Sequence, residues 1–406
     1  MTRPWIDIVG IGEDGLSGLS DAAKDVLERA DIIIGGDRHH ELSQNITAKR
    51  LSWPSPFDDL IADIRTMRGQ RLVILVTGDP LWYSVGARIS RAIPSDEIRF
   101  HPQLSAFQWA AARMGWSLPD CELLTVHGRS DSQILPYLAP GIRMLVLTQN
   151  SETPASLAAM LTARGFGESH MVVLAALGGP REKRFDSIAR DWALVVPDFH
   201  TLAIECIAEE GADWYPRTGG LPDKAFVSDG QITKRDIRAI TLSKLAPYPD
   251  AVLWDIGAGC GSVSIEWMRA ARGAISCAVE VKPERIEMIR QNTVALGAEK
   301  MEIIEGKAPQ ALEGLAQPDA VFIGGGLSNV GVFDAAWSAL RPGGRLVANV
   351  VTLEGESRLT ELQQEFGGEM SRFAMQHAQS VGPFRGWKPA MPVTQWWVSK
   401  PWADAR

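Results

Sequence analysis

The stretch WDIGAGCGSV, from Trp254 to Val263, decides how the second half of this chain folds. An apolar run ends in Asp255 and then breaks into three glycines at alternate positions, Gly257, Gly259 and Gly261. A glycine loop between a strand and a helix is typical of sites that hold the polar end of a nucleotide-like ligand. The pattern therefore predicts a Rossmann-like α/β unit with its ligand at the carboxyl end of this strand.

Charged residues near the loop help to choose the ligand. The dinucleotide fingerprint GxGxxG requires a third glycine where this chain has Ser262. The carboxylate of Asp255 would repel a pyrophosphate, but it suits the ammonium and sulfonium end of S-adenosyl-L-methionine (SAM). Glu280, which ends the next predicted strand, can accept hydrogen bonds from both ribose hydroxyls of either cofactor. We therefore expect SAM, with an NAD-type Rossmann domain as the alternative.

Later landmarks resemble class I SAM methyltransferases. EGKAP (Glu305–Pro309) stands where that family has a loop against the adenine, and LRPGGRLV (Leu340–Val347) places a Gly-Gly turn before a late strand. The fourth strand runs into DAVFIGGGLS (Asp319–Ser328), where enzymes that methylate nucleobase amines often carry a proline-aromatic motif. Glycines at this point argue against a nucleobase and leave room for a bulky methyl acceptor.

The first half has its own glycine loop, VGIGEDG (Val9–Gly15), which by itself is a weak match to GxGxxG. Five residues separate this loop from the helix that Ser20 is expected to cap, a spacing that does not suit a pyrophosphate. LVILVTGDPLWYSVG (Leu72–Gly86) resembles the signature of the tetrapyrrole methylases, the class III SAM methyltransferases. FHPQLSAFQWAAARMG (Phe100–Gly115) is similar to the next element of that family.

Apolar runs alternate with amphipathic stretches along the whole chain, which is typical of α/β folds. We expect a tetrapyrrole methylase domain at 1–208, with subdomains at about 1–116 and 117–208. A Gly- and Pro-rich linker is expected at 209–230, followed by a Rossmann-like class I SAM methyltransferase domain at 231–406. VTQWWVSK near the end is predicted to be a final antiparallel strand.

Composition restricts the classes of partner. The 406 residues are 45% hydrophobic and 22% charged, with a net charge of −8 and no long basic run. These values fit a globular, cytoplasmic protein, and we expect neither a nucleic-acid nor a membrane partner. The four cysteines form no CxxC pair, so buried thiols are expected in place of disulfides or a metal site.

Over its whole length the chain resembles the fused, decarboxylating precorrin methyltransferases of cobalamin (vitamin B12) biosynthesis. The resemblance implies one SAM per domain and a precorrin-6Y-type tetrapyrrole substrate. The first domain would methylate carbon 5, while the second would methylate carbon 15 and decarboxylate the ring C acetate, giving precorrin-8X. A homo-oligomer, either a dimer or a tetramer, is also implied.

The resemblance also implies the residues that contact the cofactor. In the second domain the expected SAM contacts are Thr233, Gly257, Ala258, Gly259, Cys260, Gly261, Glu280 and Ala308, and Asp255 joins them because of its charge. In the first domain they are Gly10, Gly12, Gly78, Asp79, Pro80, Ser105 and Ala106. Lys307 replaces an aspartate that relatives often carry, so its side chain is given no adenine contact.

Residues that act on the substrate are less visible in the sequence. Arg38, Arg129 and Lys234 are candidates for binding substrate carboxylates. The alternative is that each of them is an ordinary charged residue on the surface. Candidates for proton transfer are His39, His40 and His127, with packed or solvated histidines as the alternative. The sequence identifies no catalytic base.

Three other functions stay open at this point. One is a SAM methyltransferase for another large small-molecule acceptor, with a degenerate or regulatory first half. The second is a tetrapyrrole carrier without turnover. The third is an NAD oxidoreductase that uses residues 1–110.

Overall fold

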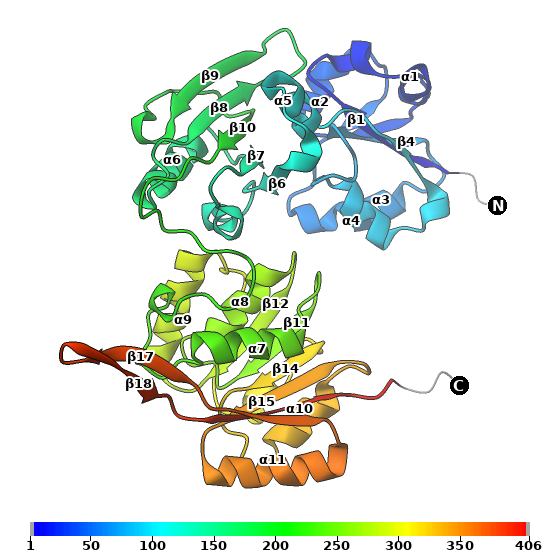
Figure 1. Ribbon diagram of the computed structural model, residues 1–406. Helices are drawn as coiled ribbons and strands as arrows, with labels where there is room; N and C mark the ends of the chain where they lie inside the picture. Colours follow the sequence, from blue (N-terminus) through cyan, green and yellow to red (C-terminus); the bar gives the residue numbers. More distant parts are fainter. Residues whose placement is uncertain (1–3, 403–406) are drawn as a thin grey trace. The chain divides into compact units, whose positions relative to one another are not determined.

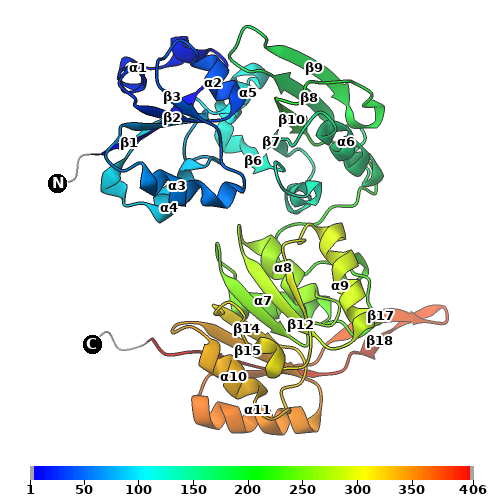
Figure 2. The same ribbon diagram turned by 180° about the vertical axis from the view of Figure 1, so that it is seen from behind.

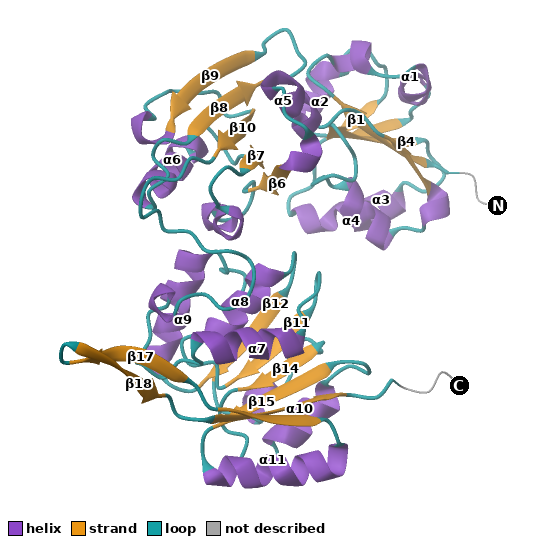
Figure 3. Cartoon of the chain, in the orientation of Figure 1, coloured by secondary structure: helices purple, strands orange, loops and turns teal. Residues whose placement is uncertain are grey.

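The computed structural model describes residues 4–402 and contains two compact units, which are described separately (Figure 1). Unit 1 comprises the chain up to Asp131 together with Ala139–Asp213. Unit 2 comprises Ser132–Leu138 and the chain from Trp214 onward. Both units are of the predicted α/β class, with helices packed against sheets (Figure 3).

The first part of unit 1 is a five-stranded sheet with strand order β3-β2-β4-β1-β5, in which all pairs are parallel. Its strands are β1 (Ile6–Ile11), β2 (Ile32–Ile34), β3 (Lys49–Leu51), β4 (Leu72–Thr77) and β5 (Ile98–His101). Its helices are α1 (Asp21–Glu28), α2 (Asp37–Leu42), α3 (Leu60–Thr66), α4 (Gly86–Ala92) and α5 (Ala106–Met114). Ile6 and Ile8 pack into one core cluster, and Val9 and Ile11 into another. Burial on both faces explains why this strand is apolar throughout.

Local signals set the first helix of unit 1. The Ser20 hydroxyl accepts a hydrogen bond from the Ala23 amide at 3.3 Å, which confirms Ser20 as the N-cap of α1. A 3-10 turn, η1 (Gly15–Gly18), lies between the glycine loop and α1. The amino end of α1 is therefore separated from the loop, as the sequence spacing predicts.

The second part of unit 1 is a mixed five-stranded sheet with order β6-β7-β10-β8-β9. Its strands are β6 (Cys121–Thr125), β7 (Arg143–Leu147), β8 (His170–Ala175), β9 (Lys183–Ile188) and β10 (His200–Glu205), and α6 (Thr153–Ala163) follows β7. Only the β6–β7 pair is parallel among these neighbours. Helix α5 contributes Phe107 and Ala110 to the core cluster of this second sheet.

Unit 2 contains a seven-stranded sheet with order β13-β12-β11-β14-β15-β19-β16. Its strands are β11 (Val252–Ile256), β12 (Ile275–Glu280), β13 (Glu302–Glu305), β14 (Ala320–Ile323), β15 (Arg345–Val350), β16 (Glu369–Phe373) and β19 (Val393–Ser399). The first five of these pair in parallel. Strand β19 pairs antiparallel with β15 and β16, which confirms the predicted final antiparallel strand.

Helices cover both faces of this sheet (Figure 2). The helices are α7 (Arg235–Leu245), α8 (Ser262–Ala270), α9 (Pro283–Leu296), α10 (Val332–Ala339) and α11 (Leu353–Phe366). Leu253 of β11 packs in a cluster with α7 and α8, while Trp254 and Ile256 pack in a cluster with α10 and α11. The chain runs from β11 outward to β13 and then returns to β14 beside β11. In open α/β sheets such a reversal of direction opens a ligand-binding crevice at the carboxyl ends of the two strands.

The segment 209–230, expected to be a linker, is partly built into unit 2. Leu221 and Phe226 are buried, and the amides of Gly220 and Leu221 donate to the buried carboxylate of Glu266. Arg238 of α7 pairs with the same carboxylate at 2.6 Å and also donates to the Leu221 carbonyl. These contacts fix the later half of the segment against α7 and α8.

The four cysteines are free thiols. Cys206, Cys260 and Cys277 are buried as expected, but Cys121 is only half-buried because it begins the edge strand β6. Among the described residues, no helix combines the length and the apolar character needed to span a bilayer.

Candidate active sites

The three glycines of the unit 2 loop all have backbone angles that L side chains rarely adopt, with φ of +74°, +60° and +78° at Gly257, Gly259 and Gly261. A Cβ on Gly257 would lie 3.0 Å from the backbone of Gly325, which follows β14. The loops after β11 and β14 therefore approach backbone to backbone at the point where the sheet reverses. This is where the topology alone predicts a ligand.

Asp255 lies directly beneath this loop and is fully buried. Its Oδ2 accepts from the Ser264 hydroxyl at 2.7 Å and from the Ser264 amide at 3.2 Å, while Oδ1 has no partner among the described residues. Burial raises the pKa of Asp255 to about 6. A buried carboxylate oxygen without a donor is unfavourable, and an ammonium group would satisfy it. The site therefore fits a ligand with a cationic polar end, as SAM has.

Glu280 ends β12 and is also buried. Its Oε2 accepts from the Gly259 amide at 2.8 Å, while Oε1 accepts from Val281 and Lys282 amides at 2.8 and 3.1 Å. A carboxylate has about four acceptor positions, so one remains free on Oε2. Glu280 can thus accept one ribose hydroxyl directly, whereas a second would replace a backbone donor.

The other predicted residues of unit 2 surround the same loop. The amides of Gly257 and Ala258 both donate to the Val279 carbonyl, at 3.0 and 3.1 Å, which ties the loop to β12. The Cys260 carbonyl accepts from Asn292 of α9 at 3.0 Å. Ala308 is buried in the core cluster beside β12 and β14. The segment that contains Thr233 also approaches the loop. The carbonyl of Gln231, two residues earlier, would lie 3.6 Å from a Cβ added to Gly259.

In unit 1 the structure brings three predicted residues together at the carboxyl ends of adjacent strands. A Cβ on Gly10 of β1 would lie 1.9 Å from the Gly78 carbonyl oxygen and 2.9 Å from Cβ of Gln103. A Cβ on Gly78, where φ is +62°, would lie 3.0 Å from Cα of Ser105. The loops after β1, β4 and β5 therefore meet, and two glycines make that approach possible.

The remaining predicted residues of unit 1 have visible structural roles in these loops. Asp79 Oδ1 accepts from the Leu81 amide at 2.8 Å, which closes a turn after β4, and Pro80 is buried beside it. Ser105 is the N-cap of α5, and its amide donates to Gln108 at 2.7 Å. Ala106 begins α5. Gly12 is half-buried, and a Cβ there would lie 2.6 Å from Asp14.

Replacing Gly10 by alanine should disrupt the meeting of the loops after β1, β4 and β5 in unit 1. The added methyl overlaps the Gly78 carbonyl, which is backbone and can move only with its loop. We expect a loss of about 1–3 kcal/mol of stability and a higher KM for SAM, which the sequence predicts as the ligand of these loops. Thermal unfolding and initial rates measure the two effects. Gly69→Ala is the control for SAM affinity: its φ of +96° makes alanine unfavourable there, so stability should also fall, but Gly69 precedes β4 and no atom lies within 4 Å of its added methyl. An equal loss of SAM affinity in Gly69→Ala would contradict the prediction.

The substrate candidates are placed differently from one another. Arg38 is part of an ion-pair cluster with Glu13 and stacks on Phe199 with its guanidinium carbon 3.9 Å from the ring centroid. Arg129 is exposed and lies 5.7 Å from the Tyr83 ring centroid. Lys234 is exposed at the start of α7, and its ammonium donates to the Gly230 carbonyl at 3.3 Å.

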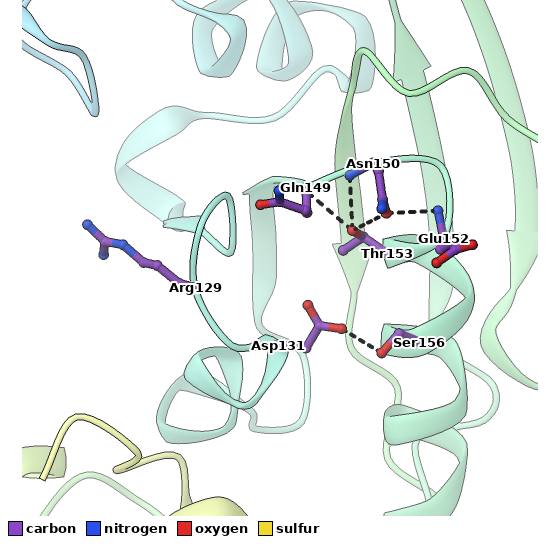
Figure 4. A pocket seen from close by; sticks show the side chains of 7 residues that line it. All are labelled: Arg129, Asp131, Gln149, Asn150, Glu152, Thr153 and Ser156. Atoms are coloured by element: carbon purple, nitrogen blue, oxygen red, sulfur yellow. Dashed lines mark hydrogen bonds between the residues drawn. The ribbon is translucent and has the colours of Figure 1, made fainter. Parts of the chain in front are cut away.

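Arg129 also lines a polar cavity of about 390 Å³ at the start of α6 (Figure 4). The cavity contains Asp131 and Glu152 as well as Arg129, and Asp131 accepts from the Ser156 hydroxyl. Two carboxylates beside one guanidinium give no preference for an anionic substrate group. The cavity therefore does not identify a carboxylate site by itself.

The three candidate histidines make structural contacts. His40 is engaged through both ring nitrogens, with the Leu51 carbonyl at 3.1 Å and with Arg50 at 3.2 Å. His127 Nδ1 is 3.2 Å from the Thr148 carbonyl. Burial lowers the pKa of His39 to about 4, with smaller effects from the charges of Arg38 and His40. His39 is thus neutral at physiological pH.

Sequence reasoning missed the residues that support these loops. Ser264 bonds Asp255 and receives a bond from Ser276 at 2.8 Å, and Asn292 joins the glycine loop to Val227. Ser264 could have been predicted from the sequence, because a serine hydroxyl in the first turn of the helix after the loop can face back toward the end of the preceding strand. Asn292 gave no signal, since only the packing of α9 brings it to the loop.

Comparisons with known proteins agree with this division of the chain. A family described as tetrapyrrole (corrin/porphyrin) methylases matches residues 6–191, and a precorrin methyltransferase domain family matches residues 224–400. Precorrin-6Y C(5,15)-methyltransferase (decarboxylating) from Sinorhizobium sp is 46% identical over 398 residues, with 98% of this chain and 96% of that protein covered.

Two further similarities concern the whole chain and its second half. The protein of the same name from Mycobacterium tuberculosis (strain ATCC 25618 / H37Rv) is 38% identical over 400 residues, with 97% of this chain and 100% of that protein covered. A crystal structure of the C-terminal domain of the Rhodobacter capsulatus precorrin-6Y C5,15-methyltransferase is 43% identical. It covers 46% of this chain and all of that chain, with a TM-score of 0.44.

The folds and matched domains define a methyltransferase with a tetrapyrrole methylase unit and a Rossmann-like unit in one chain. The chain belongs to the family of precorrin-6Y C(5,15)-methyltransferases (decarboxylating). It is an enzyme whose methyl donor is SAM, and the resemblance seen in the sequence is confirmed.

Proposed function

We propose that this enzyme transfers two methyl groups to precorrin-6Y, at carbons 5 and 15, and decarboxylates the ring C acetate to give precorrin-8X. The observation that carries the proposal is similarity along nearly the whole chain to proteins that bear this activity in their name. The two glycine-loop sites support it, because two methyl transfers to distant carbons suit two separate sites.

Unit 1 is proposed to methylate carbon 5, and unit 2 to methylate carbon 15 and release carbon dioxide. SAM, when bound, supplies an electrophilic methyl group in each unit. Because a pyrroline carbon of enamine character is already nucleophilic, the protein mainly needs to orient it and to exclude water, which in favourable systems contributes up to about 7–11 kcal/mol.

The residues of unit 2 divide these tasks. The free Oδ1 of Asp255 is proposed to hold the ammonium group and the free acceptor position of Glu280 a ribose hydroxyl. The backbone contact between Gly257 and Gly325 leaves no side chains between the two loops, so a bulky acceptor can come close.

Decarboxylation is favoured where the reacting carboxylate is poorly solvated, because its charge disperses in the transition state. Val351 and Leu353 follow β15 and are 52% and 78% exposed, and Val330 follows β14 and is 96% exposed. A bound macrocycle would cover these apolar side chains. We propose that they form the surroundings of the ring C acetate.

Mass spectrometry tests the proposal directly. Precorrin-6Y incubated with the full-length enzyme and methyl-labelled SAM should gain two labelled methyl groups and lose one carbon dioxide. Gain of methyl groups by a different acceptor only would favour the alternative methyltransferase, whereas binding of precorrin-6Y without any methylation would favour the carrier.

One SAM per unit is proposed because each unit has its own glycine-loop site. Equilibrium dialysis with labelled SAM should give two molecules bound per chain. Asp255→Asn should reduce the occupancy to about one at a SAM concentration that saturates the site of unit 1 but not the weakened site of unit 2. A stoichiometry of one in the unmodified enzyme would contradict the proposal.

A homo-oligomer is proposed from a hairpin in unit 2. Among the described strands, β17 (Gln376–Val381) and β18 (Phe384–Pro389) pair with each other alone, and they extend beyond the main sheet (Figure 1). Phe384 and Trp387 are 76% and 72% exposed at this hairpin. Because isolated two-stranded hairpins are marginal in water, this one needs a partner surface, and we propose that a second copy of the chain supplies it.

The double variant Phe384→Ser/Trp387→Ser is expected to dissociate the oligomer, since the apolar surface that drives association is removed. Sedimentation velocity measures the mass of the species. Val195→Ser in unit 1 is the control, because Val195 is 92% exposed but lies outside the hairpin. A sedimentation profile of the double variant that equals that of the unmodified protein would disprove the role of the hairpin.

A further inference from the structure

Thr77 stands at the junction of the unit 1 loops, directly before the predicted contacts Gly78, Asp79 and Pro80, but it is not itself among the residues predicted to bind a ligand. It is the last residue of β4, pairs in register with Ile11 of β1, and is followed directly by Gly78. Its side chain is exposed, whereas the five residues before it are buried. The hydroxyl therefore lies beside the glycine loop and the Gly-Asp-Pro turn.

The hydrogen bonds around Thr77 fix the direction of its proton. The Gly36 amide donates to His39 Nδ1 at 3.1 Å, so the proton of the neutral ring is on Nε2. Nε2 lies 3.1 Å from Thr77 Oγ1 and donates to it. Arg38 donates to the same oxygen. A hydroxyl has two acceptor lone pairs, and both are used, so its proton must point elsewhere.

No acceptor for that proton occurs among residues 4–402. The hydroxyl is exposed, and the cationic group next to it favours an anion: the Arg38 guanidinium donates to it and shares the single carboxylate of Glu13 with Arg181. Glu13 itself is buried. Among Arg38, Arg181 and Glu13 there is one positive charge in excess, and the Asp79 carboxylate lies in the turn that follows β4, where it accepts from the Leu81 amide.

We propose that the Thr77 hydroxyl, held by His39 and Arg38, is a hydrogen-bond donor for a carboxylate bound in the unit 1 site. This inference rests on the proposed methyl transfer by unit 1. Two ligands of that reaction carry carboxylates, namely the tetrapyrrole, through its side chains, and SAM, through its methionyl group. Thr77 is thus a binding residue that orients one of them relative to the other.

Thr77→Val tests the proposal, because valine keeps the branched shape and removes only the hydroxyl. In the full-length enzyme we expect the KM for precorrin-6Y in carbon 5 methylation, or the Kd for SAM at unit 1, to rise about tenfold. Thr77→Ser should restore most of the loss. Carbon 15 methylation, measured by mass spectrometry in the same reaction, is the internal control and should not change.

Binding assays separate the two sources of the carboxylate. A weaker Kd for SAM with an unchanged Kd for 5′-methylthioadenosine, which has no carboxylate, identifies the methionyl group. A higher KM for precorrin-6Y with an unchanged Kd for SAM identifies the tetrapyrrole. The proposal is overturned if neither value changes, if methylthioadenosine binding weakens equally, or if Thr77→Ser is as impaired as Thr77→Val.

A second variant guards against loss of folding. His39→Phe keeps a ring of similar size but removes one of the two donors to the Thr77 hydroxyl. The proton of that hydroxyl is then no longer forced outward, and we expect a rise in KM or Kd that is smaller than the rise caused by Thr77→Val. If the unmodified enzyme failed to methylate carbon 5, the proposed function of unit 1 would fail. Normal carbon 5 methylation with unchanged variants would reject the role of Thr77 alone.

Discussion

Asp255→Asn weakens SAM binding in unit 2 by about tenfold to a hundredfold and leaves unit 1 unchanged. The substitution preserves shape but removes the negative charge that is proposed to face the ammonium group of the cofactor, and a buried charged hydrogen bond contributes about 1.5–3 kcal/mol. The KM for SAM in carbon 15 methylation, the reaction proposed for unit 2, measures the effect. Carbon 5 methylation by the same molecules is the internal reference.

The same variant has a characteristic pH dependence. Burial raises the pKa of Asp255 to about 6, so in the unmodified enzyme the carboxylate becomes ionised as the pH rises through this value. SAM binding in unit 2 should therefore strengthen between about pH 5 and pH 7, and a bound ammonium would move the midpoint downward. In Asp255→Asn this dependence should disappear.

Stability distinguishes lost binding from lost folding. Because the folded-state pKa exceeds the unfolded value of 3.8, Asp255 destabilises the fold progressively from about pH 4 to pH 6, and the full penalty of about 3 kcal/mol is present above pH 6. Asparagine removes that penalty but introduces unpaired amide protons. We therefore expect the melting temperature of unit 2 at pH 8 to change little.

Asp236→Asn is the matched control, since Asp236 is exposed in the first turn of α7. It should alter neither the KM for SAM nor its pH dependence. An Asp255→Asn enzyme with normal SAM affinity in the carbon 15 reaction would refute the assignment of Asp255 to the cofactor.

Arg238→Met destabilises unit 2 by about 3–5 kcal/mol. Arg238 and Glu266 are both fully buried, and their side chains pair at 2.6 Å. Removing one member leaves the other charge without its counter-ion in the interior. The guanidinium also binds the carbonyls of Leu221 and Thr233, so the segment beside the glycine loop should loosen and the KM for SAM should rise.

Chemical denaturation of the full-length protein, followed by circular dichroism, measures the loss. Arg29→Met provides the comparison, because Arg29 and Asp25 form an ion pair that is 70% and 60% exposed and should contribute less than about 1 kcal/mol. The double variant Arg238→Met/Glu266→Gln should recover part of the stability. Equal effects of Arg238→Met and Arg29→Met would show that the buried pair does not hold this unit together.

The sequence predicted the elements that carry the loops well, because their signals are local. An apolar run ending in Asp255 and three alternating glycines require a strand, a tight turn and a helix within a few residues. The same holds for Leu72–Gly86, where a buried strand meets a Gly-Asp-Pro turn. In both cases the structure shows the expected elements.

Short polar strands were not predicted. Strand β9 (Lys183–Ile188) lies at a sheet edge, and β17 and β18 have no buried residues. A strand that buries no apolar face has no alternating pattern to read. Its formation depends on a neighbouring strand, which is information that no short window of sequence contains.

By itself, the sequence determined the class of each unit, the strands and helices that carry the glycine loops, and the family, because glycine turns, strand ends and helix caps are set by neighbouring residues. Only the tertiary structure decided which groups around those loops are still free to bind. Asp255 keeps one unpaired oxygen, Glu280 keeps one acceptor position, and Thr77 has a proton directed outward. These properties depend on partners far apart in the chain, such as Gly259 for Glu280 and His39 for Thr77, which only folding brings within hydrogen-bond distance.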